Sequence, residues 1–198
     1  MAQDRFVVTP WFANDSSASA RALVLPGGGY TVDHPVLFWS CQVLAQAGYR
    51  VVTMRWQPDD RAETDPRAFV EEGADVLDAA AGPAPVTLVV GKSLGTYAAG
   101  WASVRRYPAV WLTPVLTDES VAAALNTYSA PGLLIGGTDD GLWDPAAAKA
   151  TPLEVLELSG ADHALHHRGD WRTSVTTLKR TLEAVEAFAV EQRWALPT

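Results

Sequence analysis

The chain has 198 residues, of which 48% are hydrophobic and 19% charged, a composition typical of a folded globular protein and not of a disordered one. Its formal net charge is −8 and it contains no run of lysine or arginine, which argues against nucleic-acid binding because that function needs a basic surface. No stretch approaches the roughly 18 uninterrupted apolar residues of a membrane span. We therefore expect a single domain over residues 1–198, with neither nucleic acid nor membrane as a partner.

Cysteine usage bears on the compartment. Cys41 is the only cysteine, which excludes an intramolecular disulfide and favours a cytoplasmic location. The first 17 residues lack the basic region and apolar core of a signal peptide. Because neither a glycine-rich turn nor a histidine motif surrounds Cys41, we interpret it as a small buried residue of a helix and not as a catalytic thiol.

The predicted elements alternate between strands and helices. The first is an apolar stretch at 5–12, where Pro10 indicates an edge strand because proline cannot donate a ladder hydrogen bond. In chain order there follow a strand at 21–25, a helix at 36–47, a strand at 49–54, a polar loop at 55–65, a helix at 66–81, a strand at 86–90, a helix at 97–102, a strand at 109–113, a helix at 119–125, a strand at 131–137, a helical turn at 145–150, an outer strand at 153–158 and a long helix at 171–194. Such alternation predicts a mostly parallel sheet with helices on both faces.

The most informative stretch is 86–96, VTLVVGKSLGT. Its first five residues are uncharged and β-branched or leucine, which predicts a strand buried on both faces. A strand, a GxSxG sequence and a helix form a nucleophile elbow, in which small flanking residues permit a tight turn that exposes the serine hydroxyl. The helix N-terminus behind the serine favours developing negative charge. A glycine-rich turn with an idle Ser93 is the alternative.

Three successive glycines, Gly27 to Gly29, follow the strand at 21–25. Neither GxxxxGK[ST] nor GxGxxG spacing is present, which argues against a phosphate-binding loop. Given Ser93 downstream, we interpret this loop as a source of backbone N–H groups for an oxyanion, with a plain tight turn as the alternative.

A nucleophilic serine needs a base, and the chain has four histidines. His163 follows the strand at 153–158, so it lies at the sheet edge where the carboxyl ends of parallel strands meet. His166 and His167 lie further into a polar segment, where a solvated side chain is the simpler interpretation. His34 precedes the nucleophile and is a candidate for the pocket wall. We assign the base to His163.

A carboxylate must orient that base. Asp139 and Asp140 both follow the strand at 131–137, and Asp140 is preferred because it stands three residues after Gly137; Asp139 stays open. Asp162 is adjacent to His163 and is expected to hold the loop, since neighbouring side chains rarely meet. The predicted triad is Ser93, Asp140 and His163.

Four motifs in this order resemble those of the α/β-hydrolases, in particular the small cap-less, serine esterase-like members. They are LPGGGY (25–30), VGKSLGT (90–96), LLIGGTDDGLWD (133–144) and GADH (160–163). The resemblance covers residues 23–189 and implies an α/β-hydrolase fold. It also implies that the backbone N–H groups of Leu94 and Gly28, with Gly29 next, donate to the oxyanion.

Two features depart from many relatives. Lys92 precedes the serine where relatives carry histidine, aspartate or an aromatic residue; it either favours acidic leaving groups or is solvated. Only residues 115–130 separate the strand after the elbow from the strand before the acid, which is too short for a lid domain. We therefore expect an open site.

Together these features predict a serine hydrolase that cleaves a small carboxylic ester and needs no metal or cofactor. The alternatives are a thioesterase or amidase with the same triad, and a catalytically silent binding protein on this scaffold. Four tryptophans near the active edge are candidates for an apolar pocket, although we expect at least half of them in the core: Trp39, Trp56, Trp111 and Trp143. The pattern makes no prediction of oligomeric state.

Overall fold

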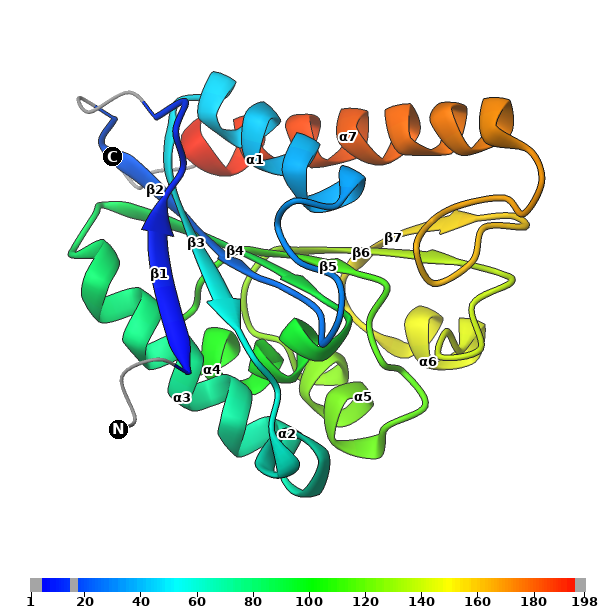
Figure 1. Cartoon of the computed structure of the whole chain (residues 1–198), viewed down its shortest axis with the longest axis horizontal. Coiled ribbons are helices and arrows are strands. Elements are labelled where there is room, and N and C mark those ends of the chain that lie inside the picture. The colour runs from blue at the N-terminus through cyan, green and yellow to red at the C-terminus, as the bar shows by residue number, and fades with distance from the viewer. Residues whose placement is uncertain (1–4, 15–17, 195–198) are drawn as a thin grey trace.

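A seven-stranded sheet with the order β1-β3-β2-β4-β5-β6-β7 runs through the middle of the molecule (Figure 1). The structure is a computed structural model that describes residues 5–14 and 18–194. Its strands are β1 (Phe6–Pro10), β2 (Ala20–Leu25), β3 (Tyr49–Trp56), β4 (Val86–Lys92), β5 (Ala109–Leu112), β6 (Gly132–Gly137) and β7 (Glu154–Leu158). β1 pairs antiparallel with β3, and the other neighbouring strands pair in parallel. The predicted mostly parallel sheet, with its proline-containing edge strand, is confirmed.

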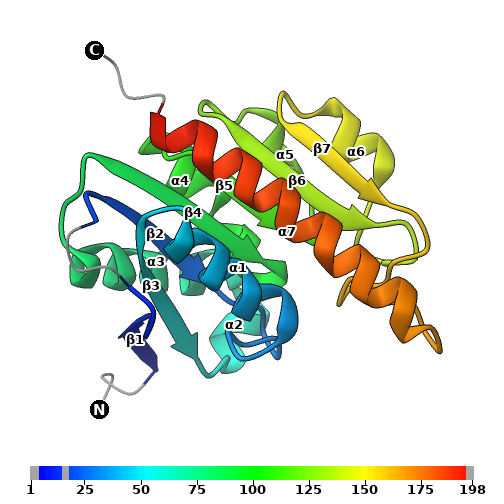
Figure 2. The same cartoon turned by 90° about the horizontal axis from the view of Figure 1, so that it is seen from above.

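Helices cover both faces of the sheet, as the alternating pattern predicts. α1 (Pro35–Gln46) and α7 (Trp171–Trp194) lie side by side on one face (Figures 1 and 2). The other face carries α3 (Pro66–Ala81), α4 (Ala99–Val104), α5 (Glu119–Asn126) and α6 (Pro145–Ala150). The short α2 (Asp60–Thr64) packs beside α3.

The core has two hydrophobic layers, one on each side of the sheet. Strand β2 shows how they arise, since all six of its residues are buried and successive side chains point to opposite faces. Leu23 and Leu25 belong to the layer that contains Phe69 of α3. Val24 belongs to the layer that contains Leu37 of α1 and the inner face of α7. β2 is apolar except for Arg21, whose guanidinium pairs with Asp78 of α3, as suits a sheet buried on both faces.

Aspartate side chains cap the N-termini of several helices. The side chain of Asp65 accepts a hydrogen bond from the Ala68 N–H at the start of α3. Asp118 and Asp144 do the same for α5 and α6, each accepting from two backbone N–H groups of the first turn. These contacts satisfy donors that have no partner within the helix.

Two predicted elements are wrong in part. The segment predicted as a loop at 55–65 contains the end of β3 and the helix α2, because β1 pairs with β3 as far as Trp56 and the Asp59 side chain caps the Arg61 N–H. The helix predicted at 97–102 begins earlier, as a 3₁₀ turn over Ser93–Ala98, and continues as α4. The Thr96 hydroxyl donates to the Ser93 carbonyl at 2.6 Å within that turn.

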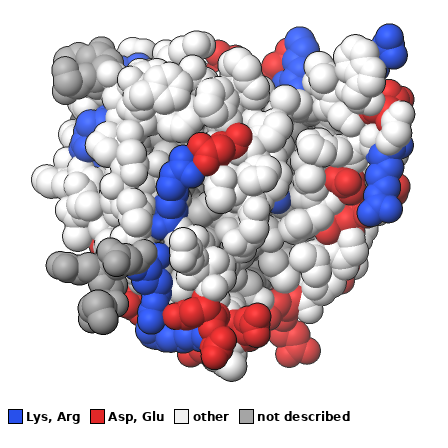
Figure 3. Space-filling view, viewed as in Figure 1, with Lys and Arg blue, Asp and Glu red and all other residues white. Residues whose placement is uncertain are grey.

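Charged side chains are sparse on much of the face that Figure 3 shows, and acidic ones gather along its lower edge, where α2 lies in the same view. No helix in the described part of the chain has both the length and the apolar character needed to cross a membrane.

Cys41 is fully buried on α1, and this burial raises the pKa of its thiol to about 12. The interpretation of Cys41 as an apolar core residue is confirmed.

Candidate active site

The turn after β4 presents Ser93 at the carboxyl edge of the sheet. Ser93 has a φ of +50°, a left-handed conformation that is strained for a residue with a side chain. The flanking positions must be glycine because neighbouring atoms leave no room for a Cβ. A Cβ at Gly91 would lie 2.6 Å from Cζ3 of Trp111, and a Cβ at Gly95 would lie 2.6 Å from the Leu25 carbonyl oxygen. The turn therefore closes only because both positions lack a side chain.

His163 connects Ser93 to Asp140 through both of its ring nitrogens. Nδ1 lies 2.7 Å from Oδ2 of Asp140, and Nε2 lies 2.8 Å from Oγ of Ser93. Because the Asp140 carboxylate can only accept, Nδ1 carries the proton and donates to it, which leaves Nε2 to accept from the serine hydroxyl. The structure thus brings together all three residues of the predicted triad, from the segments that follow β4, β6 and β7.

Each partner of Ser93 is held by its own loop. The second carboxylate oxygen of Asp140 accepts from the Leu142 N–H at 2.9 Å, and the Asp140 side chain is almost fully buried. One oxygen of Asp162 accepts from the N–H groups of Ala164 and His166, both at 2.9 Å. Asp162 therefore holds the loop that carries His163, as the sequence predicts.

The glycine loop after β2 runs against the elbow. A Cβ at Gly27 would lie 3.5 Å from Cβ of Ser93, and a Cβ at Gly28 would lie 3.9 Å from Cδ2 of Leu94. The Gly27 N–H donates to the Tyr30 carbonyl, and the Gly27 carbonyl accepts from the Trp56 indole. Among the described residues no acceptor bonds the Gly28 N–H. The two predicted oxyanion donors, Gly28 and Leu94, are therefore neighbours beside Ser93.

Lys92 is fully buried, so the interpretation of Lys92 as a solvated side chain is wrong. Its Nζ donates to Oγ1 of Thr113 at 2.9 Å and to the His163 carbonyl at 3.0 Å, and it lies 4.3 Å from the centre of the Tyr30 ring. Burial lowers the pKa of Lys92 to about 8, although the charges of Asp140 and Asp162 oppose that shift. Sequence reasoning missed this contact, whose only signal is a lysine that ends an otherwise uncharged strand.

The other titratable candidates lie outside the triad. Asp139 is exposed, and its backbone N–H donates to the Ala161 carbonyl. His34 is exposed at the start of α1, where its Nδ1 accepts from the Thr31 N–H and its ring lies against Tyr30. His166 is exposed, whereas Nε2 of His167 lies 2.8 Å from Oγ1 of Thr177.

Three of the four tryptophans singled out in the sequence belong to the core. Trp56, Trp111 and Trp143 are buried, and the last donates from its indole to the Glu157 carboxylate. Trp39 is half exposed on α1. The expectation that at least half of them fill the core is confirmed.

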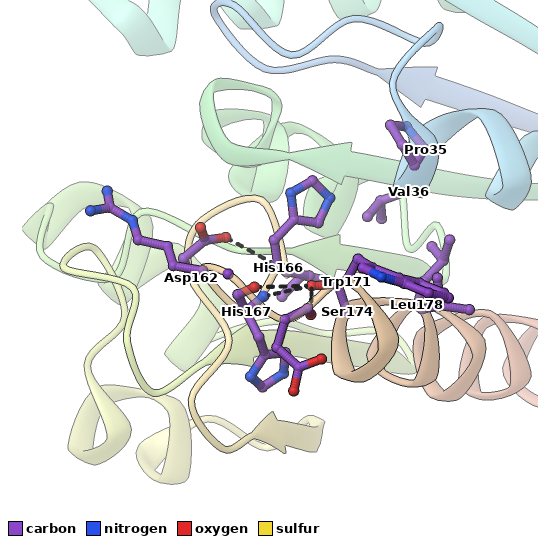
Figure 4. A pocket seen from close by; sticks show the side chains of 13 residues that line it. Pro35, Val36, Asp162, His166, His167, Trp171, Ser174 and Leu178 are labelled. Carbon is purple, nitrogen blue, oxygen red and sulfur yellow. Dashed lines mark hydrogen bonds between the residues drawn. The ribbon is translucent and has the colours of Figure 1, made fainter.

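A cavity of about 610 Å³ lies beside the loop that carries His163 (Figure 4). Pro35 and Val36 at the start of α1 line one side, and Trp171 and Leu178 of α7 line another. Asp162 contributes to the wall, but Ser93 and His163 do not. The cavity is therefore separate from the triad. The described residues contain no cluster of three or more histidine, cysteine, aspartate or glutamate side chains that could hold a metal ion.

No protein-family model matches the sequence, and no curated protein matches it. Solved structures do resemble it. Est1E from Butyrivibrio proteoclasticus, with ferulic acid bound, superposes with a TM-score of 0.72 at 14% identity over 95% of both chains. An alpha-beta serine hydrolase homologue from Coxiella burnetii gives 0.68 at 18% identity, over 92% of this chain and 89% of that one.

XC6422 from Xanthomonas campestris, described as an a/b serine hydrolase without lid, gives a TM-score of 0.61 at 15% identity, over 98% of this chain and 89% of that one. This chain has the cap-less α/β-hydrolase fold. Its strand order places residues 113–131, which contain α5, between β5 and β6 with no inserted domain. At these identities the likeness establishes the fold, and the chemistry must be argued from the site.

The close approach of the elbow to β2 can be tested at Gly95. Replacing it with alanine puts a methyl group against the Leu25 carbonyl, so we expect Gly95→Ala to lower the free energy of unfolding by about 1–3 kcal/mol. Gly141 is the matched control, because a Cβ there meets nothing within 4 Å. Urea unfolding should leave Gly141→Ala within about 1 kcal/mol of wild type. Equal stabilities of the two variants would contradict the close approach at the elbow.

Proposed function

We propose that this chain is a serine hydrolase that cleaves a small carboxylic ester through an acyl-enzyme on Ser93. The observation that carries the proposal is the pair of hydrogen bonds by which His163 links Ser93 to Asp140, at 2.8 and 2.7 Å. A serine is a weak nucleophile unless a base accepts its proton, and an imidazole within hydrogen-bond reach supplies that base.

The mechanism follows from the proton positions. Nε2 of His163 accepts the proton of Ser93 as Oγ attacks the ester carbonyl, and the imidazolium that forms is stabilised by the Asp140 carboxylate. His163 then donates that proton to the leaving alcohol, and the acyl group remains on Oγ. In the second half His163 deprotonates a water molecule that attacks the acyl carbonyl. The carboxylic acid leaves and Ser93 regains its proton.

The oxyanion that forms in each half requires donors. We assign them to the backbone N–H groups of Gly28 and Leu94, which adjoin Ser93 on two different segments. Removing one such donor typically reduces kcat by about 10²–10³-fold. The 3₁₀ turn that begins at Ser93 supports this assignment, because the first N–H groups of a helical turn have no partner within it.

The ester assignment rests on chemistry and on neighbours. Ser–His–Asp sites act on acyl groups, and the solved structures of this fold include Est1E and the esterase domain of a Rhodothermus marinus protein. The absence of an inserted lid in this fold favours a small, water-soluble ester. A thioester or an amide is the second candidate within the same mechanism, because the triad itself does not distinguish the leaving group.

The proposal is tested on Ser93 directly. We expect wild type to hydrolyse p-nitrophenyl acetate and to be labelled by a fluorophosphonate. Ser93→Ala should not be labelled, and its kcat should be at least about 10³-fold lower. Ser159→Ala is the control, since Ser159 is an exposed serine near His163. A folded wild type that is not labelled would contradict the hydrolase and indicate a binding protein. Labelling without ester turnover would redirect the search to thioesters and amides.

The orienting acid can be separated from its neighbour. In Asp140→Asn the amide oxygen can keep the Leu142 N–H, so the NH2 group faces Nδ1 of His163, where it donates and favours the wrong tautomer. We therefore expect kcat to fall by roughly 10³–10⁴-fold. Asp139→Asn changes an exposed side chain one residue away and should leave kcat within about twofold. Steady-state kinetics of the two variants decides between them. A larger loss for Asp139→Asn would move the assignment to Asp139.

A further inference from the structure

Lys92 is a buried cation that the acyl-transfer mechanism does not use. It precedes Ser93 at the end of β4, and its side chain is 0% exposed. A lysine is rarely buried so completely without a partner, because removing an ammonium from water is costly. Lys92 has three partners, each on a different segment of the site.

The Lys92 ammonium has two hydrogen-bond acceptors and one aromatic ring as partners. Two of the N–H groups of Lys92 donate to oxygen atoms, namely Oγ1 of Thr113 and the His163 carbonyl oxygen. The positive charge also lies over the Tyr30 ring, 4.3 Å from its centre, which is the geometry of a cation–π contact. One charged group therefore reaches the end of β5, the loop that carries His163 and the loop that follows β2.

Two of those segments carry part of the proposed machinery, and the third, at Thr113, is strained. The His163 carbonyl belongs to the base itself. Tyr30 accepts the Gly27 N–H at its carbonyl and the Val36 N–H at its hydroxyl, so it anchors the glycine loop. Thr113 has a φ of +43°, which is unusual for a β-branched residue. The hydrogen bond from Lys92 is therefore made to a residue, Thr113, whose backbone conformation is strained and must be stabilised by its surroundings.

We propose that Lys92 is a positioning residue that holds the His163 loop and the glycine loop in register around Ser93. The inference rests on the proposed function, because it assigns Lys92 a role in that reaction. Lys92 acts through the residues that it contacts, since full burial keeps its ammonium away from a substrate in solvent. This geometry does not favour the hypothesis that Lys92 selects acidic leaving groups.

The positive charge of Lys92 does not increase the free energy of unfolding. Burial lowers its pKa from 10.5 in an unfolded chain to about 8 in the folded one. Between these values the unfolded state binds the proton more strongly, so stability rises with pH across this window and the protonated side chain is a cost below pH 8. The charged side chain thus lowers the stability of the fold at neutral pH, which supports a role in function.

The groups that face Lys92 come from four segments. They are Asp140 after β6, Asp162 and His163 after β7, Tyr30 after β2 and the uncharged Thr113 after β5. Above its pKa Lys92 keeps two N–H bonds for its oxygen partners but loses the charge that attracts the Tyr30 ring. The glycine loop is therefore expected to loosen first as pH rises.

The test compares wild type with Lys92→Met, which keeps the length of the side chain and removes its charge and donors. Lys149→Met, at an exposed position in α6, is the control. We expect Lys92→Met to lower kcat for p-nitrophenyl acetate by about 10–100-fold with KM within about threefold. The wild-type kcat should fall above a pH near 8, and that alkaline limb should be absent from Lys92→Met but present in Lys149→Met.

Two readouts do not depend on turnover. Hydrogen exchange should become faster in residues 27–34 and 159–170 of Lys92→Met and stay unchanged in Lys149→Met. The free energy of unfolding of wild type relative to Lys92→Met should rise between about pH 8 and 10.5. Both follow from a buried ammonium that connects these two loops.

Unchanged exchange in both loops, together with a Lys92→Met kcat within about twofold of wild type, would overturn the positioning role and leave the proposed function intact. A second pattern would also overturn the positioning role. If Lys92→Met loses kcat but keeps the alkaline limb of the wild-type pH profile, and is less stable than wild type below pH 8, the substitution causes a general structural defect. A folded wild type that is neither active nor labelled overturns the proposed function and the role of Lys92 in it.

Discussion

The strained turn at Ser93 is the constraint on which the site depends. It closes only because Gly91 packs against the Trp111 ring and Gly95 against the Leu25 carbonyl, with no room for a side chain at either position. The turn brings the serine to the edge where the parallel strands end. The loops after β2, β6 and β7 reach the same edge, so residues far apart in sequence meet there.

The site gathers more buried polarity than the triad alone requires. Asp140 and Lys92 carry charges that have almost no contact with water, and the two are close enough for the carboxylate to raise the pKa of the ammonium against the effect of burial. Such groups lower stability unless every donor and acceptor is satisfied, and here each one has named partners. The carboxyl edge of this sheet therefore combines strain and buried charge, whereas the remainder of the sheet is mostly apolar, with Arg21 of β2 paired to Asp78 of α3.

Much of this arrangement is predictable from sequence because it depends on local patterns. Uncharged runs predict buried strands, and the elbow predicts where the serine lies. The choice between Asp139 and Asp140 is different, since both follow β6 and only the direction of the side chains distinguishes them. The burial of Lys92 was not predictable either, because a lysine at the end of a strand is solvated or buried according to loops from three other segments. The short α2 was missed because its cap at Asp59 lies in a polar, proline-containing segment.

The central claim is that Ser93 becomes acylated, and trapping that intermediate tests it most directly. Wild type is mixed with excess p-nitrophenyl acetate, quenched in acid during turnover, digested and analysed by mass spectrometry. Because p-nitrophenolate is a good leaving group, acylation is the faster half and the acyl-enzyme accumulates. We expect the peptide that contains Ser93 to gain one acetyl group, with an initial burst of p-nitrophenol. Turnover of the ester with no acetyl group on Ser93, or with the acetyl group on another residue, would contradict the claim.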